Sequence, residues 1–359
     1  LPALIDAQWF PATTAVYLGA ANLAGYLGGA LTGKWLATKF PPYQVLRAMM
    51  LLATISFFAC MQPVSFLWYF IWRFAAGVSG GVLMVMAAST VLVQVPAAKR
   101  GIAGGIIFTG VGIGIALSGT LVPALIHIGL IQTWAALGLI SMALTLAAWC
   151  FWPVTDRLAP AHHQGSGRRS AFELPFISLY VVYALDATGL VAHMVFLVDY
   201  TARGLNLGIT VGAGYWVLFG IGAALGPLVA GRIADTFGFR NTLRVFLLVQ
   251  AFAVALTVTY TTNLSLSVSS FLVGAVVPGI VPLVVGRAHE LSKSDLHLQR
   301  SAWSLATVGF SVGQAGAAYA FSYIFEISGQ YEVLFLISSG AVALAFVIDM
   351  LTPGQKPQA

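Results

Sequence analysis

Long apolar segments follow one another along almost the whole chain, separated by short polar stretches. A bilayer core about 30 Å thick requires roughly 20 apolar residues per helix, and each segment is about that long. The segments lack the alternation of a membrane β-barrel, so they predict helices. We expect eleven membrane-spanning helices, at approximately 13–36, 43–62, 66–94, 102–126, 130–152, 173–200, 209–234, 241–261, 264–288, 301–325 and 332–351.

The composition agrees with a membrane protein. Of 359 residues, 59% are hydrophobic and 8% are charged, and the mean hydropathy is +0.91; soluble domains carry about 25% charged residues. The formal net charge of +6 does not predict a nucleic-acid partner, because the basic residues are scattered through short loops. Cys60 and Cys150 both fall within predicted spans and imply no disulfide framework.

One polar gap divides the chain. Residues 153–172 contain glycine, serine, histidine and arginine, and they form the only sizeable interruption between apolar segments. We therefore predict an N-terminal bundle at 1–152, a linker at 153–172 and a C-terminal bundle at 173–359.

The basic residues also predict the orientation, because cytoplasmic loops of membrane proteins carry an excess of lysine and arginine. The loops on one side of the membrane contain a single basic residue, Arg203. Arg73 belongs to neither side, because it lies inside a span. The linker and the C-terminus belong to the other, basic set, so both are predicted to be cytoplasmic. That set holds Lys34, Lys39, Arg47, Lys99, Arg100, Arg157, Arg168, Arg169, Arg232, Arg240, Arg244, Arg287, Lys293, Arg300 and Lys356.

An internal repeat predicts two similar halves. Gly33 is expected to end one helix as Gly231 ends another, and Arg100 opens a glycine-rich helix as Arg300 does. In the second half a complete span, 173–200, precedes the helix with Gly231. Its counterpart would lie before residue 1, so we expect a parent protein of twelve spans, six plus six, whose first helix is missing here.

Residues 231–240 resemble a family motif. Gly231, Asp235, Gly238 and Arg240 match G-x-x-x-D-x-x-G-x-R, the cytoplasmic loop motif of the major facilitator superfamily. The first-half copy keeps Gly33 and basic residues but has Thr38 or Lys39 where the acid would stand. The chain is most similar to the bacterial YbfB/YjiJ-type members, and two looser matches are Arg73-x3-Gly77-x3-Gly81 and the glycine run from Gly105 to Pro123, which is similar to a fifth-helix motif of antiporters.

The resemblance implies two six-helix bundles in a bacterial inner membrane. Apart from the resemblance, the motif suits a gating role, because Asp235 and Arg240 stand at a helix end and a tight turn. There the carboxylate can cap a neighbouring helix and pair with the arginine, which would hold the two halves together. The alternative is a loop of solvated charges that only fixes the topology.

Ionisable residues inside the membrane are costly and mark candidate sites. Arg73 lies roughly 10 Å along its span from the outer side, and Asp186 roughly 20 Å along its span from the inner side, so both are expected near the midplane. His193 follows Asp186 by two helical turns and is expected on the same face. A buried carboxylate with a nearby histidine suits a proton path. The alternative is a polar pair that only fixes helix packing.

Other polar and aromatic residues within the spans are candidates for the cavity wall. Asn22, Tyr183 and Trp216 are predicted there, although aromatic residues also anchor helices at the interface and asparagine also bridges helices. The glycine stripes Gly25/Gly29/Gly33 and Gly77/Gly81 predict close packing between helices.

Several signals are rejected. Residues 77–81 match the nucleophile pattern G-x-S-x-G, but Ser79 stands among the small residues of a packed helix, so no enzyme is predicted. No phosphate-binding loop is present, and His162 and His163 lie in the linker beside arginines, so neither ATP, a cofactor nor a metal is expected.

The sequence therefore predicts a monomeric, proton-coupled secondary transporter of a small organic solute that works by alternating access. Asp186 is the expected proton carrier, Arg73 is expected to attract an anionic group, and the glycine run favours antiport. The alternatives are an uncoupled facilitator or exchanger of organic anions, and a membrane receptor on the same fold that binds without transport.

Overall fold

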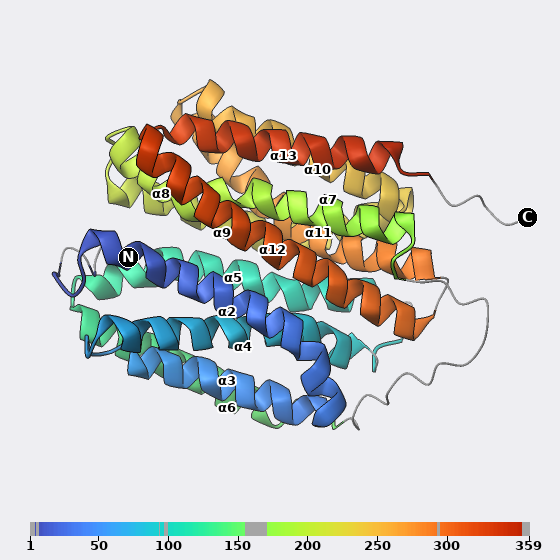
Figure 1. The fold of residues 1–359 in the computed structure, drawn as a ribbon, viewed down its shortest axis with the longest axis horizontal. Coiled ribbons are helices and arrows are strands. Elements are labelled where there is room, and N and C mark those ends of the chain that lie inside the picture. The colour runs from blue at the N-terminus through green and yellow to red at the C-terminus, as the bar shows by residue number, and fades with distance from the viewer. Residues whose placement is uncertain are drawn as a thin grey trace, which may run out of the picture. The chain divides into compact units, whose positions relative to one another are not determined.

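The computed structural model describes residues 4, 7–92, 94–96, 100–154, 171–292 and 295–353, and these are helical apart from short connections. Figure 1 shows the helices as long rods. In chain order they are α2 (Ala12–Lys39), α3 (Pro42–Ala59), α4 (Phe66–Leu92), α5 (Arg100–Ile126), α6 (Leu130–Trp149), α7 (Leu174–Val191), the π-helical η2 (Ala192–Phe196), α8 (Leu197–Asp199), the π-helical η3 (Tyr200–Gly204), α9 (Ile209–Phe237), α10 (Phe239–Thr259), α11 (Asn263–Ser292), α12 (Leu296–Ser328) and α13 (Tyr331–Leu351).

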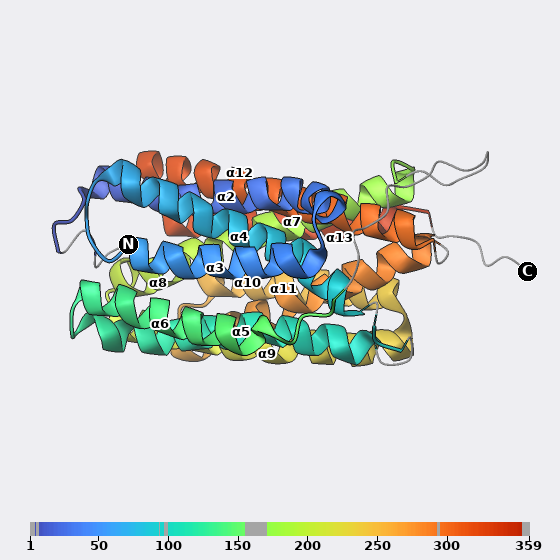
Figure 2. The same ribbon diagram turned by 90° about the horizontal axis from the view of Figure 1, so that it is seen from below.

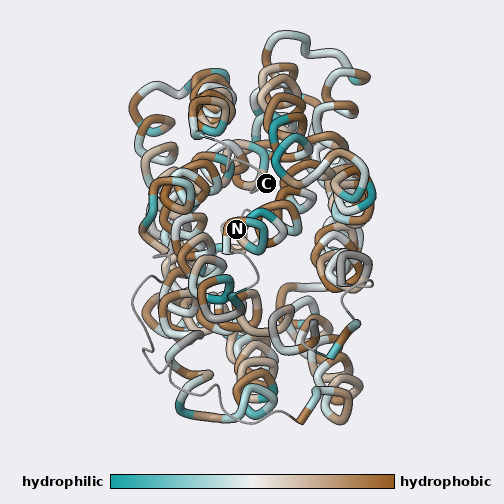
Figure 3. The backbone as a smooth tube through the Cα atoms, turned by 90° about the vertical axis from the view of Figure 1, so that its right-hand side faces the viewer, coloured by the Kyte–Doolittle hydropathy of each residue, from teal (hydrophilic) through white to brown (hydrophobic). Residues whose placement is uncertain are grey.

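Each predicted span coincides with a helix, and the span at 173–200 is built from α7, η2, α8 and η3 joined end to end. Within the described residues, nine helices are long and apolar enough to cross a membrane. Figure 3 looks along the helices and shows apolar positions, in brown, recurring through both units. The prediction of an all-helical, polytopic membrane protein is confirmed.

The chain divides into two compact units. The first comprises Leu1–Val95 and Leu121–His163, and the second comprises Pro96–Thr120 and Gln164–Ala359. Most of α5 therefore groups with the second unit, because its glycine-rich face packs on α9: a Cβ atom added to Gly112 would lie 2.0 Å from the backbone nitrogen of Ala224. The predicted linker lies largely outside the described residues, and the predicted domain boundaries stay a prediction.

Glycines bring α2 and α4 into backbone contact in the first unit (Figure 2). A Cβ atom added to Gly25 would lie 2.0 Å from the carbonyl oxygen of Phe74, and one added to Gly77 would lie 1.9 Å from that of Asn22. A Cβ atom added to Gly29 would lie 2.2 Å from the carbonyl oxygen of Val78. The predicted close-packing glycine faces are confirmed, because a side chain at these positions would separate the two helices.

The second unit repeats this packing 197 positions later, between α9 and α11. A Cβ atom added to Gly222 would lie 2.2 Å from the carbonyl oxygen of Phe271, and one added to Gly274 would lie 2.1 Å from that of Phe219. A Cβ atom added to Gly226 would lie 1.8 Å from the carbonyl oxygen of Ala275. Because equivalent glycines meet equivalent backbone atoms, the two units share a packing plan, as the internal repeat predicted.

The repeat was right, but the predicted helix ends were wrong. Gly33 lies within α2, which continues to Lys39, and Gly231 lies within α9, which continues to Phe237. The second helix ends at Gly238, whose φ of +79° favours glycine. The first ends just before two prolines, which cannot donate a backbone hydrogen bond.

Candidate functional site

Asp186 is completely buried in α7. Its side chain has no solvent-exposed area, and neither carboxyl oxygen has a hydrogen-bond partner among the described residues. A buried polar group without a partner is costly, and a buried charge without one costs far more. Asp186 is therefore a costly side chain at this position, and a candidate for function.

Gln250, on α10, reaches α7 at the level of Asp186. Its Nε2 donates a long hydrogen bond of 3.4 Å to the backbone carbonyl of Asp186, while its Oε1 has no partner among the described residues. The amide lies close enough to the Asp186 carboxyl to act on its charge, although the contact does not reach hydrogen-bond geometry. Gln250 is fully buried, so its amide has no access to water that could substitute for these contacts.

His193 lies in η2, where α7 is interrupted, and it also points toward α10. Ser269 Oγ donates its one proton to Ala253 O, 2.6 Å away, so it accepts from Thr257 Oγ1 at 2.7 Å and from His193 Nε2 at 3.0 Å. Thr257 has used its own proton, so its 3.3 Å contact with His193 also needs a proton on Nε2. The network assigns the ring proton to Nε2. Nδ1 is left as an acceptor without a partner among the described residues.

Asp186 and His193 occupy two levels of one seam between α7 and α10. Each is linked to the α10 residue 64 positions later, Asp186 to Gln250 and His193 to Thr257. The two levels are seven residues apart, or roughly 10 Å along the helix. The carboxyl and the imidazole thus lie on one side of α7 without touching.

The aromatic candidates of the second unit are packed into its helices. Tyr183 is buried, with its ring 4.7 Å from that of Phe310 and 6.2 Å from that of Trp303. Trp216 stacks on Phe219 at 5.0 Å, and its indole nitrogen lies 3.4 Å from Ser118 Oγ on α5. Both side chains have packing roles, and their predicted place in a cavity wall stays a prediction.

Arg73 and Asn22 meet in the first unit. Asn22 Nδ2 donates to the backbone carbonyl of Arg73 at 3.1 Å, which fixes α2 against α4 beside the glycine contacts. The half-buried Arg73 side chain makes no hydrogen bond or ion pair with any side chain of the described residues. A guanidinium offers five donors that suit a carboxylate or phosphate, so this cation is available to an anion.

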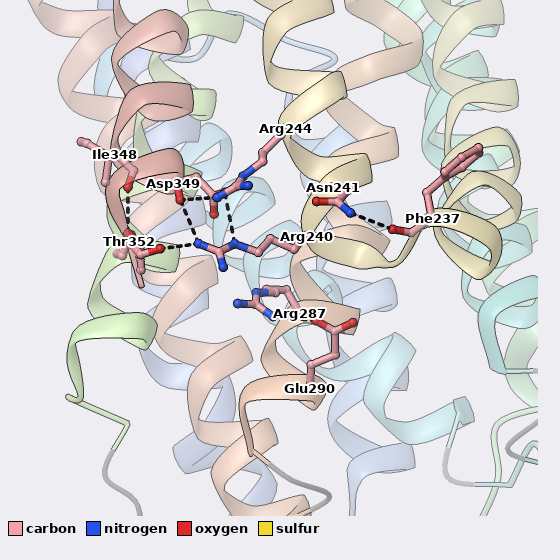
Figure 4. A network of polar contacts seen from close by, with 10 residues as sticks. Phe237, Arg240, Asn241, Arg244, Arg287, Glu290, Ile348, Asp349 and Thr352 are labelled. Atoms are coloured by element: carbon pink, nitrogen blue, oxygen red, sulfur yellow. Dashed lines mark hydrogen bonds and ion pairs between the residues drawn. The ribbon is translucent and has the colours of Figure 1, made fainter. Parts of the chain in front are cut away.

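The loop motif leads to a charge cluster at one end of the second unit (Figure 4). Arg244 Nε lies 2.6 Å from Asp349 Oδ2 on α13, and Arg240 Nε lies 3.8 Å from the same oxygen. Arg240 also donates to the backbone carbonyls of Asp349 and Thr352. We call Arg240, Arg244 and Asp349 the Asp349 cluster. Nearby, Arg287 Nη1 lies 2.7 Å from Glu290 Oε2.

The expected pairing of Asp235 with Arg240 is wrong for the described residues. Asp235 is exposed near the end of α9, and the turn at Gly238 leads Arg240 toward α13, where Asp349 supplies the carboxylate. A Cβ atom added to Gly231 would have no neighbour within 4 Å, and one added to Gly33 would touch Val85 at 3.4 Å. These two glycines are therefore not held by the tight contacts seen elsewhere, and the gating role of the motif stays a prediction.

Sequence reasoning missed Gln250, Arg244 and Asp349. Gln250 could have been noticed as a polar residue within an apolar span, seven positions before Thr257. Asp349 could have been noticed as an acid within the last apolar span. Only the packing shows which partners they have. For metals, no group of three histidine, cysteine or acidic residues was found among the described residues.

Comparisons with known proteins agree on family and fold. A family model described as "Uncharacterised MFS-type transporter YbfB" matches residues 1–350. A search of curated proteins found no match. The fold is similar to that of the E. coli fucose:proton symporter FucP, with a TM-score of 0.71, 15% identity, and coverage of 97% of this chain and 92% of that one.

Two further structures share the fold. The human organic anion transporter MFSD10 (TETRAN) has a TM-score of 0.71 and 18% identity, with coverage of 93% of this chain and 83% of that one. A bacterial homologue of the iron transporter ferroportin, in an outward-facing state, has a TM-score of 0.62 and 19% identity, with coverage of 97% and 92%.

Proposed function

From the premise that this chain belongs to the YbfB-type family of major facilitator transporters, we propose that it moves a small organic solute across the membrane by alternating access, coupled to protons. The family and its solved neighbours are transporters and not enzymes. The observation that carries proton coupling is the buried, unpartnered carboxyl of Asp186.

Asp186 suits a proton carrier because of its surroundings. An ionised carboxylate without donors or a counter-ion would cost several kcal/mol at this position, whereas a bound proton removes the charge. These surroundings therefore favour the protonated, neutral carboxyl over the carboxylate. A conformation that admits water or a hydrogen-bond donor to Asp186 would stabilise the carboxylate, and the proton would leave. Proton binding and helix rearrangement are therefore coupled through this side chain.

Arg73 supports the proposal that the solute carries an anionic group. Its guanidinium has no counter-ion among the described residues, and a cation at membrane depth is stabilised by pairing with an anion. A bound carboxylate would satisfy two of its donors at once. Two structural neighbours are described as an organic anion transporter and a proton symporter, which supports the solute class and the coupling.

The Asp349 cluster supports a gating role for one end of the second unit. Asp349 holds two arginines that follow the Gly238 turn, so it joins the start of α10 to the end of α13. By the positive-inside rule this end faces the cytoplasm of a bacterial inner membrane, as do the linker and the C-terminus. We propose that the protein works there as a monomer, and that the glycine-rich α5 favours antiport.

The decisive experiment uses the full-length protein in liposomes. A thermal-shift panel of small carboxylates first identifies a solute that binds. The flux of that solute in radiolabelled form is then measured under an imposed pH gradient. Asp186→Asn should reduce net gradient-driven flux at least tenfold but leave solute exchange, which needs no proton release, unchanged. Glu326→Gln, at an exposed acid on α12, is the control.

An uncoupled exchanger of organic anions is the second candidate. Arg73, which has no counter-ion among the described residues, favours this exchanger as much as it favours the proton-coupled transporter. Normal gradient-driven flux in Asp186→Asn would establish that alternative. Binding of a carboxylate without any flux in the wild-type protein would establish a receptor.

A further inference from the structure

With Asp186 ionised, the unpartnered polar atoms between α7 and α10 would all be hydrogen-bond acceptors. They are both carboxyl oxygens of Asp186, Oε1 of Gln250 and Nδ1 of His193. A buried seam in which acceptors face no donors is unstable unless protons occupy it. At the Asp186 level the donor at hand is the Gln250 amide, whose present bond to a backbone carbonyl is long, at 3.4 Å.

The position of the Gln250 amide is set by the helices around it. Gly189, one turn after Asp186, has no side chain, and a Cβ atom there would lie 3.3 Å from Gln250 Nε2 and 2.1 Å from Val342 Cγ2 on α13. The absence of that side chain lets the amide lie against α7. The fully buried Gln250 therefore has Asp186 as its polar neighbour and cannot turn to water.

No charged group competes for the Asp186 carboxyl. The elements packed on α7 are α10, α11, α12 and α13, and none of their described residues forms an ion pair with Asp186. The charged residues of α10 and α13 are Arg240, Arg244, Glu332 and Asp349. Arg240, Arg244 and Asp349 are joined to one another near the helix ends, and Glu332 lies in the first turn of α13.

We propose that Gln250 is the positioning residue for the proton on Asp186, and that its amide presents a different atom to each protonation state. When the carboxyl holds its proton, the amide leaves its long bond to the Asp186 carbonyl and its Oε1 accepts from the O–H. When the proton leaves, the amide turns over and Nε2 donates to the carboxylate. This inference rests on the proposed function, in which Asp186 is the proton carrier.

An amide is the side-chain group best suited to this task. It carries one acceptor and two donors on a single rotatable plane and remains neutral in both states. The bond from Nε2 to the carbonyl is weak, so turning the amide sacrifices little, and the new bond to a carboxylate is charge-assisted. A charged partner would instead hold Asp186 in one protonation state.

Infrared difference spectroscopy of the full-length protein in lipid nanodiscs tests the inference without knowledge of the solute. The probe is the proton, titrated from mildly acidic to alkaline pH. The C=O stretch of the Asp186 carboxylic acid is the band that Asp186→Asn removes. Its frequency rises when the acid loses a hydrogen bond, and a control variant separates that loss from a general loss of packing.

The test variant is Gln250→Met, which keeps the volume and removes the amide. We expect the Asp186 band to move to higher frequency in this variant. The control is Ser339→Ala, which removes a 2.8 Å hydrogen bond from α13 to the backbone of Ala251 on α10 and should leave the band in place. If Gln250→Met does not fold, Gln250→Asn, whose shorter side chain draws the amide back from α7, should give the same shift.

The outcomes separate this inference from the proposed function. An Asp186-dependent band that is unchanged in Gln250→Met overturns the role of Gln250 and leaves proton binding by Asp186 intact. An equal shift in Ser339→Ala shows a general packing effect and also overturns it. If wild-type protein has no Asp186-dependent band at any pH, the proton-carrier proposal itself fails.

Discussion

Replacing Gly226 with alanine should separate α9 from α11. The new Cβ atom would lie 1.8 Å from the carbonyl oxygen of Ala275 and 2.5 Å from its carbonyl carbon. Ordinary carbon–oxygen contact needs more than 3 Å, so the helices must move apart by over 1 Å or bend. Because the obstacle is backbone, no side chain can rotate away.

The cost can be worked from two opposing effects. Overpacking of this kind costs about 1–3 kcal/mol, and the close α9–α11 contacts on either side of Gly226 would loosen as well. The higher helix propensity of alanine returns at most about 1 kcal/mol. The net loss is about 2 kcal/mol, or a fall in melting temperature of roughly 3 °C for a chain of this length.

The assay is thermal unfolding of the purified protein in detergent, followed by tryptophan fluorescence. Gly214→Ala, on the same helix, is the matched control, because a Cβ atom there meets nothing within 4 Å. It should leave the melting temperature unchanged or raise it slightly. By the internal repeat, Gly29→Ala should behave like Gly226→Ala. If Gly226→Ala melts as high as Gly214→Ala, the backbone contact between α9 and α11 is not as described.

Three further predictions concern the charged residues. Asp349→Asn should destabilise the protein by about 2 kcal/mol, since it leaves Arg240 and Arg244 without their carboxylate; adding Arg244→Met should recover part of the loss in a double-mutant cycle, and strict additivity would contradict the pairing. Asp186→Leu should raise the stability at alkaline pH by about 1–3 kcal/mol, because it removes a buried acid that has no counter-ion among the described residues; a marked fall in melting temperature would show that a charged group pairs with the carboxylate. Arg73→Gln should abolish the thermal shift given by carboxylate ligands, which for a ligand at 100 times its Kd is about 2.7 kcal/mol; an unchanged shift would place the anion elsewhere.

The positions of the helices and the repeat could be predicted because the bilayer imposes them. Each span needs about 20 apolar residues, so the hydrophobic pattern alone marks α3 or α13 closely. Glycines at four-residue spacing predicted close helix faces for the same local reason, and Gly25 and Gly77 confirmed them. Helix ends depend on local turn residues: the internal repeat predicts ends at Gly33 and Gly231, whereas a proline pair and Gly238 supply them.

The candidate site could be predicted only as a set of unusual residues. The sequence identifies Asp186 and Arg73 because charge is rare in apolar spans, but it does not say what each contacts. Gln250 meets Asp186 across 64 positions, and Asp349 meets Arg240 across 109, so both contacts depend on the register and rotation of helices packed side by side. Local apolar patterns fix which segments are helices. Which polar groups they bring together, and which they leave unpartnered, was decided only by the tertiary packing.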